Sequence, residues 1–239
     1  TANVTFKAEK GGIENTGTIT ATAGDVKDAE GNVVKAGNAS IIMNAKKVTN
    51  NNTVNAQTNV DIDATNGDAV NNGTLNAGND IDIDATGGDI ANNGTAEAGQ
   101  NVDLNATGDV TTSANGTITS GNDTKLNAGN NITTNGTITS AGNTSLNAKE
   151  TGAIEVNGTV NADGSISGTA ENGPITIGAA MNSNNGGIAL ETNKDITING
   201  ALHSANGDIK ADSKQGNIDN NANITVENGN INEKAGGYI

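Results

Sequence analysis

The chain repeats itself every 20–22 residues, and this period constrains its fold more than any other feature. The tripeptide Asn-Gly-Thr recurs at intervals of 21, 22, 20 and 22 residues. Its threonines are Thr74, Thr95, Thr117, Thr137 and Thr159, with Thr18 and Thr53 as earlier members and Ala180 and Ala201 as later, degenerate ones. A period of this length is typical of solenoids, in which each repeat forms one coil and stacks on its neighbours.

A second apolar position follows the Gly-rich or Asx-rich turns with the same period. The residues at this position are Ile13, Val48, Val70, Ile90, Val110, Ile132, Ile154, Ile175, Ile196 and Ile218. The first interval is 35 residues, every later one is 20–22, and one further step reaches Ile239. We therefore expect about ten coils, with residues 1–239 forming a single β-helix segment cut from a longer rod.

A third segment of each repeat alternates apolar and polar residues. Its clearest members are Val60–Ala64, Ile81–Ala85, Val102–Ala106, Thr124–Ala128 and Thr144–Ala148. Alternation with a period of two predicts strands, so each coil holds three short ones. Each strand must pair with the equivalent strand one coil along, about 4.8 Å away. The sequence thus predicts an all-β parallel β-helix in which Leu75 lies beside Val54 and Ala96, and Ile83 beside Ile62 and Leu104.

Other architectures fit the sequence poorly. Asn, Gly, Thr and Asp are weak helix formers, and no window carries an apolar stripe of helical spacing. A leucine-rich repeat needs several leucines per repeat, whereas most coils here have one or none. Disorder would explain the polar composition, but a disordered chain has no reason to keep apolar residues at a fixed spacing.

Composition predicts a thin core and sharp corners. The only aromatic residues are Phe6 and Tyr238, so the core must be built from Ile, Val, Leu and Ala. The dipeptides Asn-Gly, Gly-Asn and Gly-Asp mark the corners. Gly and Asn tolerate left-handed backbone conformations, so the chain is expected to turn there without strain. Asparagines stacked at successive corners are expected to form amide ladders between coils.

Charge excludes two classes of partner. The chain has 27 acidic residues and 12 basic ones, all lysine, which gives a net charge of −15. Nucleic-acid binding depends on clustered positive charge, so we expect no nucleic-acid partner. Anionic lipid surfaces are disfavoured for the same reason, and no apolar run is long enough to span a bilayer, so no membrane insertion is expected.

One interval is longer than the others. Thr18 and Thr53 are 35 residues apart, and the excess lies in residues 24–38. Val26, Val33 and Val34 flank an Ala-Glu-Gly-Asn turn, which predicts a hairpin that protrudes from the first coil. Two roles remain open for it, a tolerated loop insertion and a receptor-binding element.

The repeats in Gly67–Ala148 follow the pattern G-[DN]-[IV]-x-[NT]-N-G-T-[LIV]-x-A-G-x-x-[IVL]-x-[LI]-x-A. This pattern resembles the filamentous-haemagglutinin repeats of two-partner secretion exoproteins, and degenerate copies extend the resemblance over nearly the whole chain. Members of that family include adhesins, haemolysin-like exoproteins and the shafts of contact-dependent inhibition toxins. The resemblance implies a right-handed β-helix that is exported across a Gram-negative outer membrane. The Asn-Pro-Asn-Leu motif of the family's secretion-signal domain is missing from the sequence, which implies the repetitive middle of such a protein.

Aspartates recur on the polar face of the third segment. Asp61 and Asp63 are expected to stack over Asp82 and Asp84, with Asp103 next. Carboxylates about 5 Å apart repel one another unless they are hydrated, screened or bridged by a cation. Two interpretations stay open, a solvated acidic face and a calcium site between coils at Asp61, Asp63, Asp82 and Asp84. We expect no other cofactor.

The sequence offers no catalytic residues. Polysaccharide-active β-helices need converging carboxylates or a basic residue, usually with aromatic platforms for sugar rings. The only histidine, His203, falls where other coils place Asn76 and Thr139, so we expect it to face solvent. The sequence therefore predicts a protein that is not an enzyme.

Regular rows of threonine on a flat sheet are typical of ice-binding proteins, so ice binding is another possible interpretation. Thr117 and Thr119 match Thr137 and Thr139 one repeat later. The second column is interrupted by Asn55, Asn76, Glu97 and Asn161, so a regular flat lattice is not expected.

Taken together, these features predict the shaft of a large bacterial adhesin, exposed on the cell surface or secreted. Its expected partners are neighbouring β-helix segments of the same protein, or identical subunits stacked end to end into a filament, and a host-cell or matrix receptor. The alternative from another class is a ligand-binding β-helix module for a glycan, a receptor or calcium.

Overall fold

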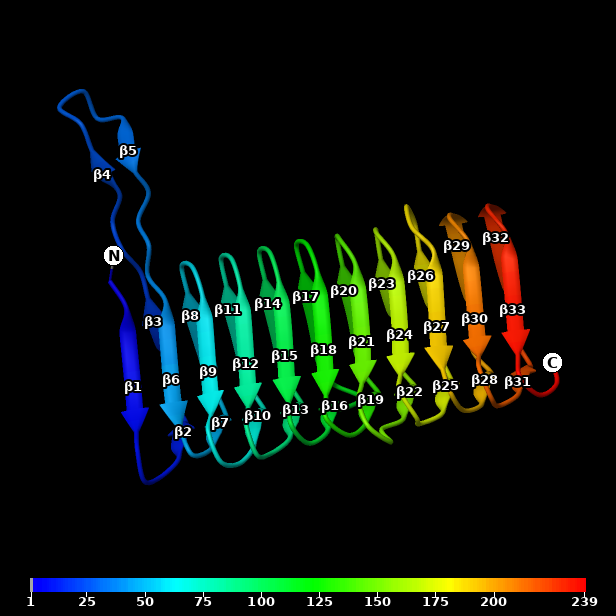
Figure 1. Cartoon of the computed structure of the whole chain (residues 1–239). Helices are drawn as coiled ribbons and strands as arrows, with labels where there is room; N and C mark the ends of the chain where they lie inside the picture. Colours follow the sequence, from blue (N-terminus) through cyan, green and yellow to red (C-terminus); the bar gives the residue numbers. More distant parts are fainter. Residues whose placement is uncertain (1) are drawn as a thin grey trace.

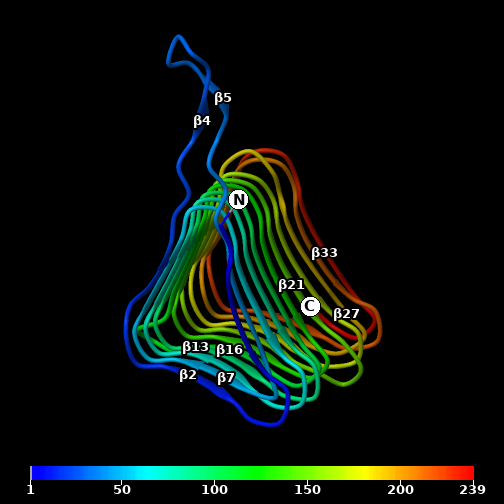
Figure 2. The same ribbon diagram turned by 90° about the vertical axis from the view of Figure 1, so that its left-hand side faces the viewer.

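The computed structural model describes residues 2–239, which form a parallel β-solenoid without any helix in that range. Three parallel sheets run the length of the rod, and we call them A, B and C in the order in which the chain visits them (Figure 1). Viewed along the axis, the coils superpose as a rounded triangle with one sheet on each side (Figure 2). The predicted fold class is confirmed, while the handedness remains a prediction of the family resemblance.

Sheet A has 11 strands of five residues each. They are β1 (Val4–Ala8), β6 (Ile41–Ala45), β9 (Val60–Ala64), β12 (Ile81–Ala85), β15 (Val102–Ala106), β18 (Thr124–Ala128), β21 (Thr144–Ala148), β24 (Ile166–Ala170), β27 (Ile188–Thr192), β30 (Ile209–Ser213) and β33 (Ile231–Ala235).

Sheets B and C have 10 strands each, one per coil. Sheet B contains β2 (Ile13–Asn15), β7 (Val48–Asn50), β10 (Ala69–Asn71), β13 (Ile90–Asn92), β16 (Val110–Thr112), β19 (Ile132–Thr134), β22 (Ile154–Val156), β25 (Ile175–Ile177), β28 (Ile196–Ile198) and β31 (Ile218–Asn220). Sheet C contains β3 (Ile19–Ala21), β8 (Thr53–Ala56), β11 (Thr74–Ala77), β14 (Thr95–Ala98), β17 (Thr117–Ser120), β20 (Thr137–Ser140), β23 (Val160–Ala162), β26 (Met181–Ser183), β29 (Leu202–Asn206) and β32 (Ile224–Asn228).

The core consists of aliphatic columns, because equivalent residues stack from coil to coil. Leu75 pairs with Val54 on one side and Ala96 on the other. Ile83 pairs with Ile62 and Leu104 in the same way, as the repeat predicts. One such column lies on sheet A and runs through Met43, Ile62, Ile83, Leu104, Leu126 and Leu146, all of them buried. Burial of each such side chain contributes about 1.5–3 kcal/mol relative to exposure.

The sequence pattern assigns one residue, Val70, wrongly to the core. Ala69, not Val70, takes the inward position between Val48 and Ile90, and Val70 is only half-buried. Both residues are apolar, so alternation alone could not decide between them. The neighbour Asn71 decides, because its side chain is buried beside those of the preceding and following coils and therefore fixes residue 69 on the same face.

Glycine serves the corners in a different way from the one expected. Among the described residues, φ is positive at only four glycines and at Glu150. At most corners the backbone itself leaves no space: a Cβ atom on Gly94 would overlap the carbonyl oxygen of Gly73, and one on Gly73 would overlap that of Asn52. Glycine at these corners thus permits close stacking of successive coils rather than a left-handed turn.

Residues between β3 and β6 leave the rod as an antiparallel hairpin of β4 (Val26–Lys27) and β5 (Val33–Lys35). The hairpin extends well beyond the outline of the coils (Figures 1 and 2). At its base the backbone N–H of Gly37 donates a hydrogen bond of 2.7 Å to Oδ1 of Asp25. At its tip Oδ1 of Asp28 accepts hydrogen bonds from two backbone N–H groups.

Candidate functional site

The outward face of sheet A carries a cluster of five aspartates that we call the acidic face: Asp61, Asp63, Asp82, Asp84 and Asp103. The strand register places Asp61, Asp82 and Asp103 in one row and Asp63 and Asp84 in a second row beside it. This is the stacking that the sequence predicts. Lys125 follows Asp103 in the first row, and Asn105 follows Asp84 in the second, so the acidic face ends there.

Mutual repulsion and loss of hydration raise the pKa values within the first row. For Asp82 the pKa is raised to about 6, mainly by desolvation, and then by the negative charges of Asp84, Asp103 and Asp61. Desolvation also raises the pKa of Asp61 and of Asp103, although at Asp103 the nearby Lys125 ammonium opposes the shift. The acidic face therefore carries charge that destabilises the folded chain near neutral pH.

The calcium prediction rests on the same carboxylates. Within residues 2–239, no three Asp, Glu or His side chains converge on one point in the way that a metal site requires. The carboxylates form extended rows, in which Nδ2 of Asn44 donates a hydrogen bond of 3.1 Å to Oδ2 of Asp63. Calcium binding stays a prediction, and calorimetric titration of the protein with calcium tests it.

A shallow groove that sequence reasoning missed continues from the acidic face. It has a volume of about 610 Å³ and begins at Asp84, with Asn105, Asn127 and Asn147 in the same outward row. Nδ2 of Asn127 donates a hydrogen bond of 2.7 Å to Oδ1 of Asn105. The available signal was the recurrence of Leu-Asn-Ala at the ends of three strands, but a groove depends on how far the adjacent corner projects, which residue types do not reveal.

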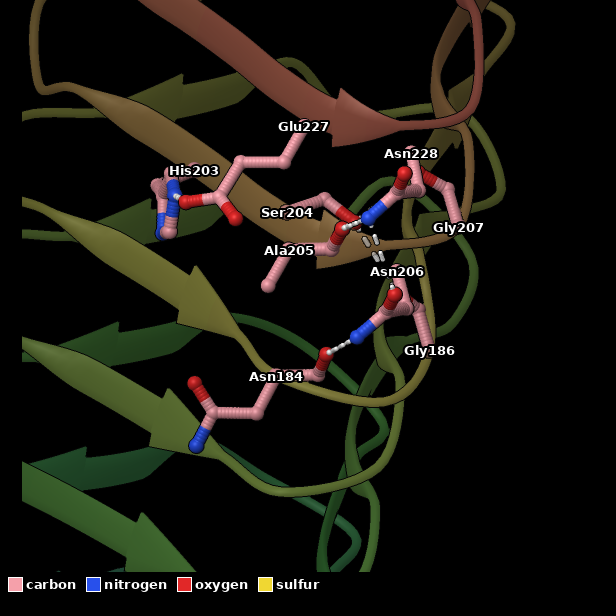
Figure 3. Close-up of polar contacts among 9 residues, drawn as sticks. All are labelled: Asn184, Gly186, His203, Ser204, Ala205, Asn206, Gly207, Glu227 and Asn228. Carbon is pink, nitrogen blue, oxygen red and sulfur yellow. Dashed lines mark hydrogen bonds and ion pairs between the residues drawn. The ribbon is translucent and has the colours of Figure 1, made fainter.

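His203 lies on the outward face of β29, as predicted, and pairs with Glu227 of the next coil (Figure 3). The distance between Nε2 and Oε1 is 3.2 Å. The adjacent hydroxyl of Ser204 is buried on the opposite face of the strand, where it donates to the carbonyl oxygens of Gly186 and Gly207. Because successive side chains of a strand point to opposite faces, His203 cannot activate Ser204 as a nucleophile.

The threonine rows on sheet C are in register, but the second row is short. Thr117 pairs with Thr137 and Thr119 pairs with Thr139. Glu97 precedes Thr119 in its row and Asn161 follows Thr139. The ice-binding interpretation remains a prediction, which a thermal-hysteresis measurement tests.

No family model matches this chain, and neither curated proteins nor solved structures gave a significant match. The resemblance to filamentous-haemagglutinin repeats therefore rests on the sequence pattern alone. No helix capable of crossing a bilayer was found in residues 2–239.

Replacement of Asp82 with asparagine is expected to stabilise the chain at neutral pH. Between about pH 4 and pH 6 the folded state binds more protons at Asp82 than the unfolded state, so stability falls as the pH rises through this window. The carboxylate is partly solvated, which reduces the gain on substitution to about 1 kcal/mol at pH 7. Urea unfolding at several pH values measures this, and the variant should show a flatter pH dependence than the parent chain.

Asp208→Asn is the matched control. Hydrogen bonds from Asn230 and Lys210 hold the pKa of Asp208 below its usual range, so this carboxylate favours the folded state when charged. Its removal should not stabilise the chain at neutral pH. Equal stabilisation by both substitutions would show that net charge alone, and not the acidic face, is responsible.

Proposed function

We propose that this chain is a non-enzymatic structural shaft, a stiff spacer that holds another part of a larger assembly at a distance. The observation that carries the proposal is the unbroken pairing of three parallel sheets with 11, 10 and 10 strands over one continuous aliphatic core. Each coil adds about 4.8 Å, so the ten coils give a rod of about 50 Å. Stability in such a rod is a sum over coils and the interfaces between them, which allows length to vary without a change of fold.

Deletion of Thr65–Ala106 tests this proposal. It joins Ala64 to Thr107 and removes two coils, and Ala64, Ala85 and Ala106 occupy equivalent places on sheet A. The shortened chain is expected to fold with the same circular dichroism per residue and to be shorter by about 10 Å in small-angle X-ray scattering. Any tethering activity of the parent protein should survive with a reduced reach.

A deletion out of register provides the control. Removing residues 65–94 deletes two strands of sheet B, β10 and β13, and joins Ala64 of sheet A directly to Thr95 of sheet C. This variant should be much less stable than the in-register deletion, because the coil at the junction has no strand of sheet B and β7 and β16 each lose a partner. If it folds as well as the in-register deletion, the columns do not specify the structure and the shaft proposal fails.

The shaft is proposed to belong to a bacterial surface-exposed or secreted adhesin, and the sequence resemblance is the support for this. Of the two end-to-end partners, a different β-helix segment fits better than an identical copy. On sheet A, Glu233 takes the inward place after Ala211, and Phe6 takes that place before Met43. Stacking of two copies in register would press the Glu233 carboxylate, which accepts a hydrogen bond of 3.2 Å from Nδ2 of Asn220, against the Phe6 ring, and this is unfavourable because the ring offers no partner for the charge. Light scattering over a concentration series tests self-association.

The hairpin favours a second candidate, a binding module. Val26, Val33 and Val34 on the hairpin are 55%, 53% and 62% exposed, although apolar side chains elsewhere are mostly buried in the core. Isolated two-stranded hairpins are marginally stable in water, and three exposed valines on one fit an element that contacts a partner.

Deletion of Asp25–Gly37 separates the two roles. The hydrogen bond between Gly37 and Asp25 brings the two ends of the deleted segment together, so the chain can be rejoined there without disturbing the first coil. A shaft should keep its melting temperature and any tethering role, whereas a binder that acts through the hairpin should lose its receptor or glycan. Retention of binding would transfer that role to the acidic face or the groove.

A further inference from the structure

Asn-Gly dipeptides occur eleven times in this chain, and such dipeptides can undergo deamidation, a reaction that has no part in the proposed shaft function. The backbone nitrogen of the glycine can attack Cγ of the preceding asparagine, with its proton passing to solvent. A C–N bond forms, ammonia leaves from Cγ, and a five-membered succinimide results. Water then opens the ring to aspartate or to isoaspartate, in which the main chain runs through the former side chain. Water is the only co-reactant, and no oxidation or reduction occurs.

Seven of the eleven glycine amides are held in hydrogen bonds that oppose this attack. Their acceptors are backbone carbonyl oxygens, mostly of the preceding coil, and in one case a threonine hydroxyl. The glycines are Gly73, Gly94, Gly116, Gly136, Gly158, Gly200 and Gly207. An amide that donates a hydrogen bond must release its acceptor before it can reach Cγ, so reaction at these dipeptides is slowed.

At four of these dipeptides, those that begin at Asn72, Asn93, Asn157 and Asn206, Nδ2 of the asparagine donates a hydrogen bond as well. Nδ2 of Asn72 donates to Oδ1 of Asn51 at 2.8 Å, and Nδ2 of Asn93 donates to Oδ1 of Asn72 at 2.9 Å. Both asparagines are nevertheless exposed to solvent. Exposure alone therefore does not decide whether an Asn-Gly dipeptide in this rod can react.

Four glycine amides, those of Gly67, Gly173, Gly186 and Gly229, donate no hydrogen bond within residues 2–239. Gly173 is buried, which keeps water and base away from its amide. At the dipeptide Asn228-Gly229 the asparagine side chain is fixed, because Nδ2 of Asn228 donates to the carbonyl oxygen of Ala205 at 3.3 Å and to Oδ1 of Asn206 at 3.2 Å (Figure 3). Among the residues that the structure describes, only two Asn-Gly dipeptides combine a glycine amide that donates no hydrogen bond with an asparagine side chain that makes none.

We propose that Asn66-Gly67 and Asn185-Gly186 are sites of spontaneous deamidation. Asn66 and Asn185 are both exposed, and neither side chain makes a hydrogen bond with any other described residue. Asn66 lies in the corner between β9 and β10, and Asn185 in the corner between β26 and β27. No hydrogen bond of the glycine amide or of the asparagine side chain has to break before the glycine nitrogen approaches Cγ.

Modification at these corners changes both charge and backbone. Each event adds one negative charge to a chain of net charge −15, and at residue 66 the new carboxylate lies two residues from Asp68. Isoaspartate also lengthens the main chain by one carbon at a corner that joins two strands of the same coil. An isoaspartyl carboxylate is the chemical class of substrate that protein carboxyl methyltransferases recognise, so the two corners become sites for such an enzyme.

Long incubation of the folded chain in mildly alkaline buffer tests the proposal, with peptide mapping by mass spectrometry as the readout. Asn66 and Asn185 are expected to convert to a mixture of aspartate and isoaspartate at least about tenfold faster than Asn72 and Asn93, since two hydrogen bonds oppose reaction at each of the latter. Asn66→Gln should abolish conversion at residue 66 and leave conversion at Asn185 unchanged. Conversion of Asn72 and Asn93 at the same rate, or none at Asn66 and Asn185 while a short peptide of the same sequence reacts, would overturn the proposal.

Hydrogen exchange tests the structural premise separately. The amides of Gly67 and Gly186 should exchange with deuterium much faster than those of Gly73 and Gly94. Slow exchange at Gly67 and Gly186 would show that these amides are held by hydrogen bonds in solution and would contradict the assignment. Because the measurement reports on the folded chain, unfolding during incubation cannot imitate the expected result.

Discussion

Replacement of Leu126 with aspartate is expected to lower the free energy of unfolding by about 5 kcal/mol. Leu126 is fully buried on β18, between Leu104 of one coil and Leu146 of the next. Loss of a leucine from a packed core costs about 2–5 kcal/mol, and a buried carboxylate without a partner adds several more unless the group is protonated. Both costs fall on one coil in the middle of the rod.

The form of the unfolding curve should change together with the midpoint. A solenoid is stabilised by contacts between neighbouring coils, so a lesion in a central coil uncouples the two halves. Urea denaturation followed by circular dichroism is expected to show one transition for the parent chain and two for Leu126→Asp. Lowering the pH should restore part of the stability, because the new carboxyl group is then protonated.

Asn127→Asp is the control, because it places the same carboxylate at the next residue on the outer face. Asn127 is half-buried and hydrogen-bonded to Asn105, so its replacement should cost no more than about 1 kcal/mol. Losses of equal size at residues 126 and 127 would contradict the assignment of faces on which the whole core depends.

Repetition is the reason that so much of the fold could be predicted. A column is recognised when the same kind of residue recurs at a fixed interval, and one column fixes the register of the strands around it. The pairing of Ile83 with Ile62 and Leu104, and of Asp82 with Asp61 and Asp103, follows from the period alone.

The errors occur where one side chain depends on another in a neighbouring coil. The sequence pattern places Val70 in the column of sheet B, and the burial of Ala69 and Asn71 shows that Ala69 takes this place. The available signal was the recurrence of asparagine two residues after Ile13, Val48 and Ile90, since residues two apart on a strand share a face.

A second group of buried polar residues was also missed. At the corner from sheet C to sheet A, two coils replace the usual alanine and aliphatic residue with serine and threonine. Ser120 lies 2.9 Å from Thr124, and Ser140 lies 2.8 Å from Thr124 and 2.9 Å from Thr144 between their hydroxyl oxygens. The hydroxyl groups thus satisfy one another's hydrogen-bonding capacity inside the rod.

The raised pKa of Asp82 was beyond prediction from the sequence for a related reason. The period places Asp82 between two other aspartates, and repulsion follows from that. Desolvation is nevertheless the larger cause, and it depends on how closely the neighbouring strands and side chains surround the carboxylate. Spacing in the sequence contains no information on that quantity.

Replacement of Asn71 with alanine is expected to lower the free energy of unfolding by about 3 kcal/mol, although the residue is polar. The side chains of Asn15, Asn50, Asn71 and Asn92 form a buried ladder on the inner face of sheet B. Nδ2 of each of the first three donates to Oδ1 of the next, at 2.7, 2.8 and 2.8 Å. Nδ2 of Asn71 also donates to the carbonyl oxygen of Thr95 at 3.0 Å. Alanine leaves these buried acceptors without donors, at about 1–3 kcal/mol for each group.

Asn72→Ala is the matched control for Asn71→Ala. Asn72 is the next residue in the sequence and belongs to a second amide ladder, which is exposed to solvent. Asn72 accepts from Asn93 and donates to Asn51 at the same corner of the rod. Water replaces these bonds when the side chain is removed, so the expected loss is below about 1 kcal/mol. Thermal and urea unfolding of both variants measure the difference, and equal losses would mean that burial does not set the strength of the inner ladder.

The same column of sheet B indicates how the inner ladder could be dispensed with. After Asn92 it continues through Thr112 and Thr134 to Val156, Ile177 and Ile198, so apolar residues fill this position in later coils. One stretch of a column can therefore consist of amides and another of aliphatic residues, but a single aliphatic residue within the amide stretch leaves its neighbours without hydrogen-bond partners. Asn71→Val should accordingly be nearly as destabilising as Asn71→Ala, whereas simultaneous replacement of Asn50, Asn71 and Asn92 by valine should recover much of the loss. Failure of the triple variant to recover would indicate that the amides also fix the turn that follows them, where Nδ2 of Asn50 donates to the carbonyl oxygen of Asn52 at 2.8 Å.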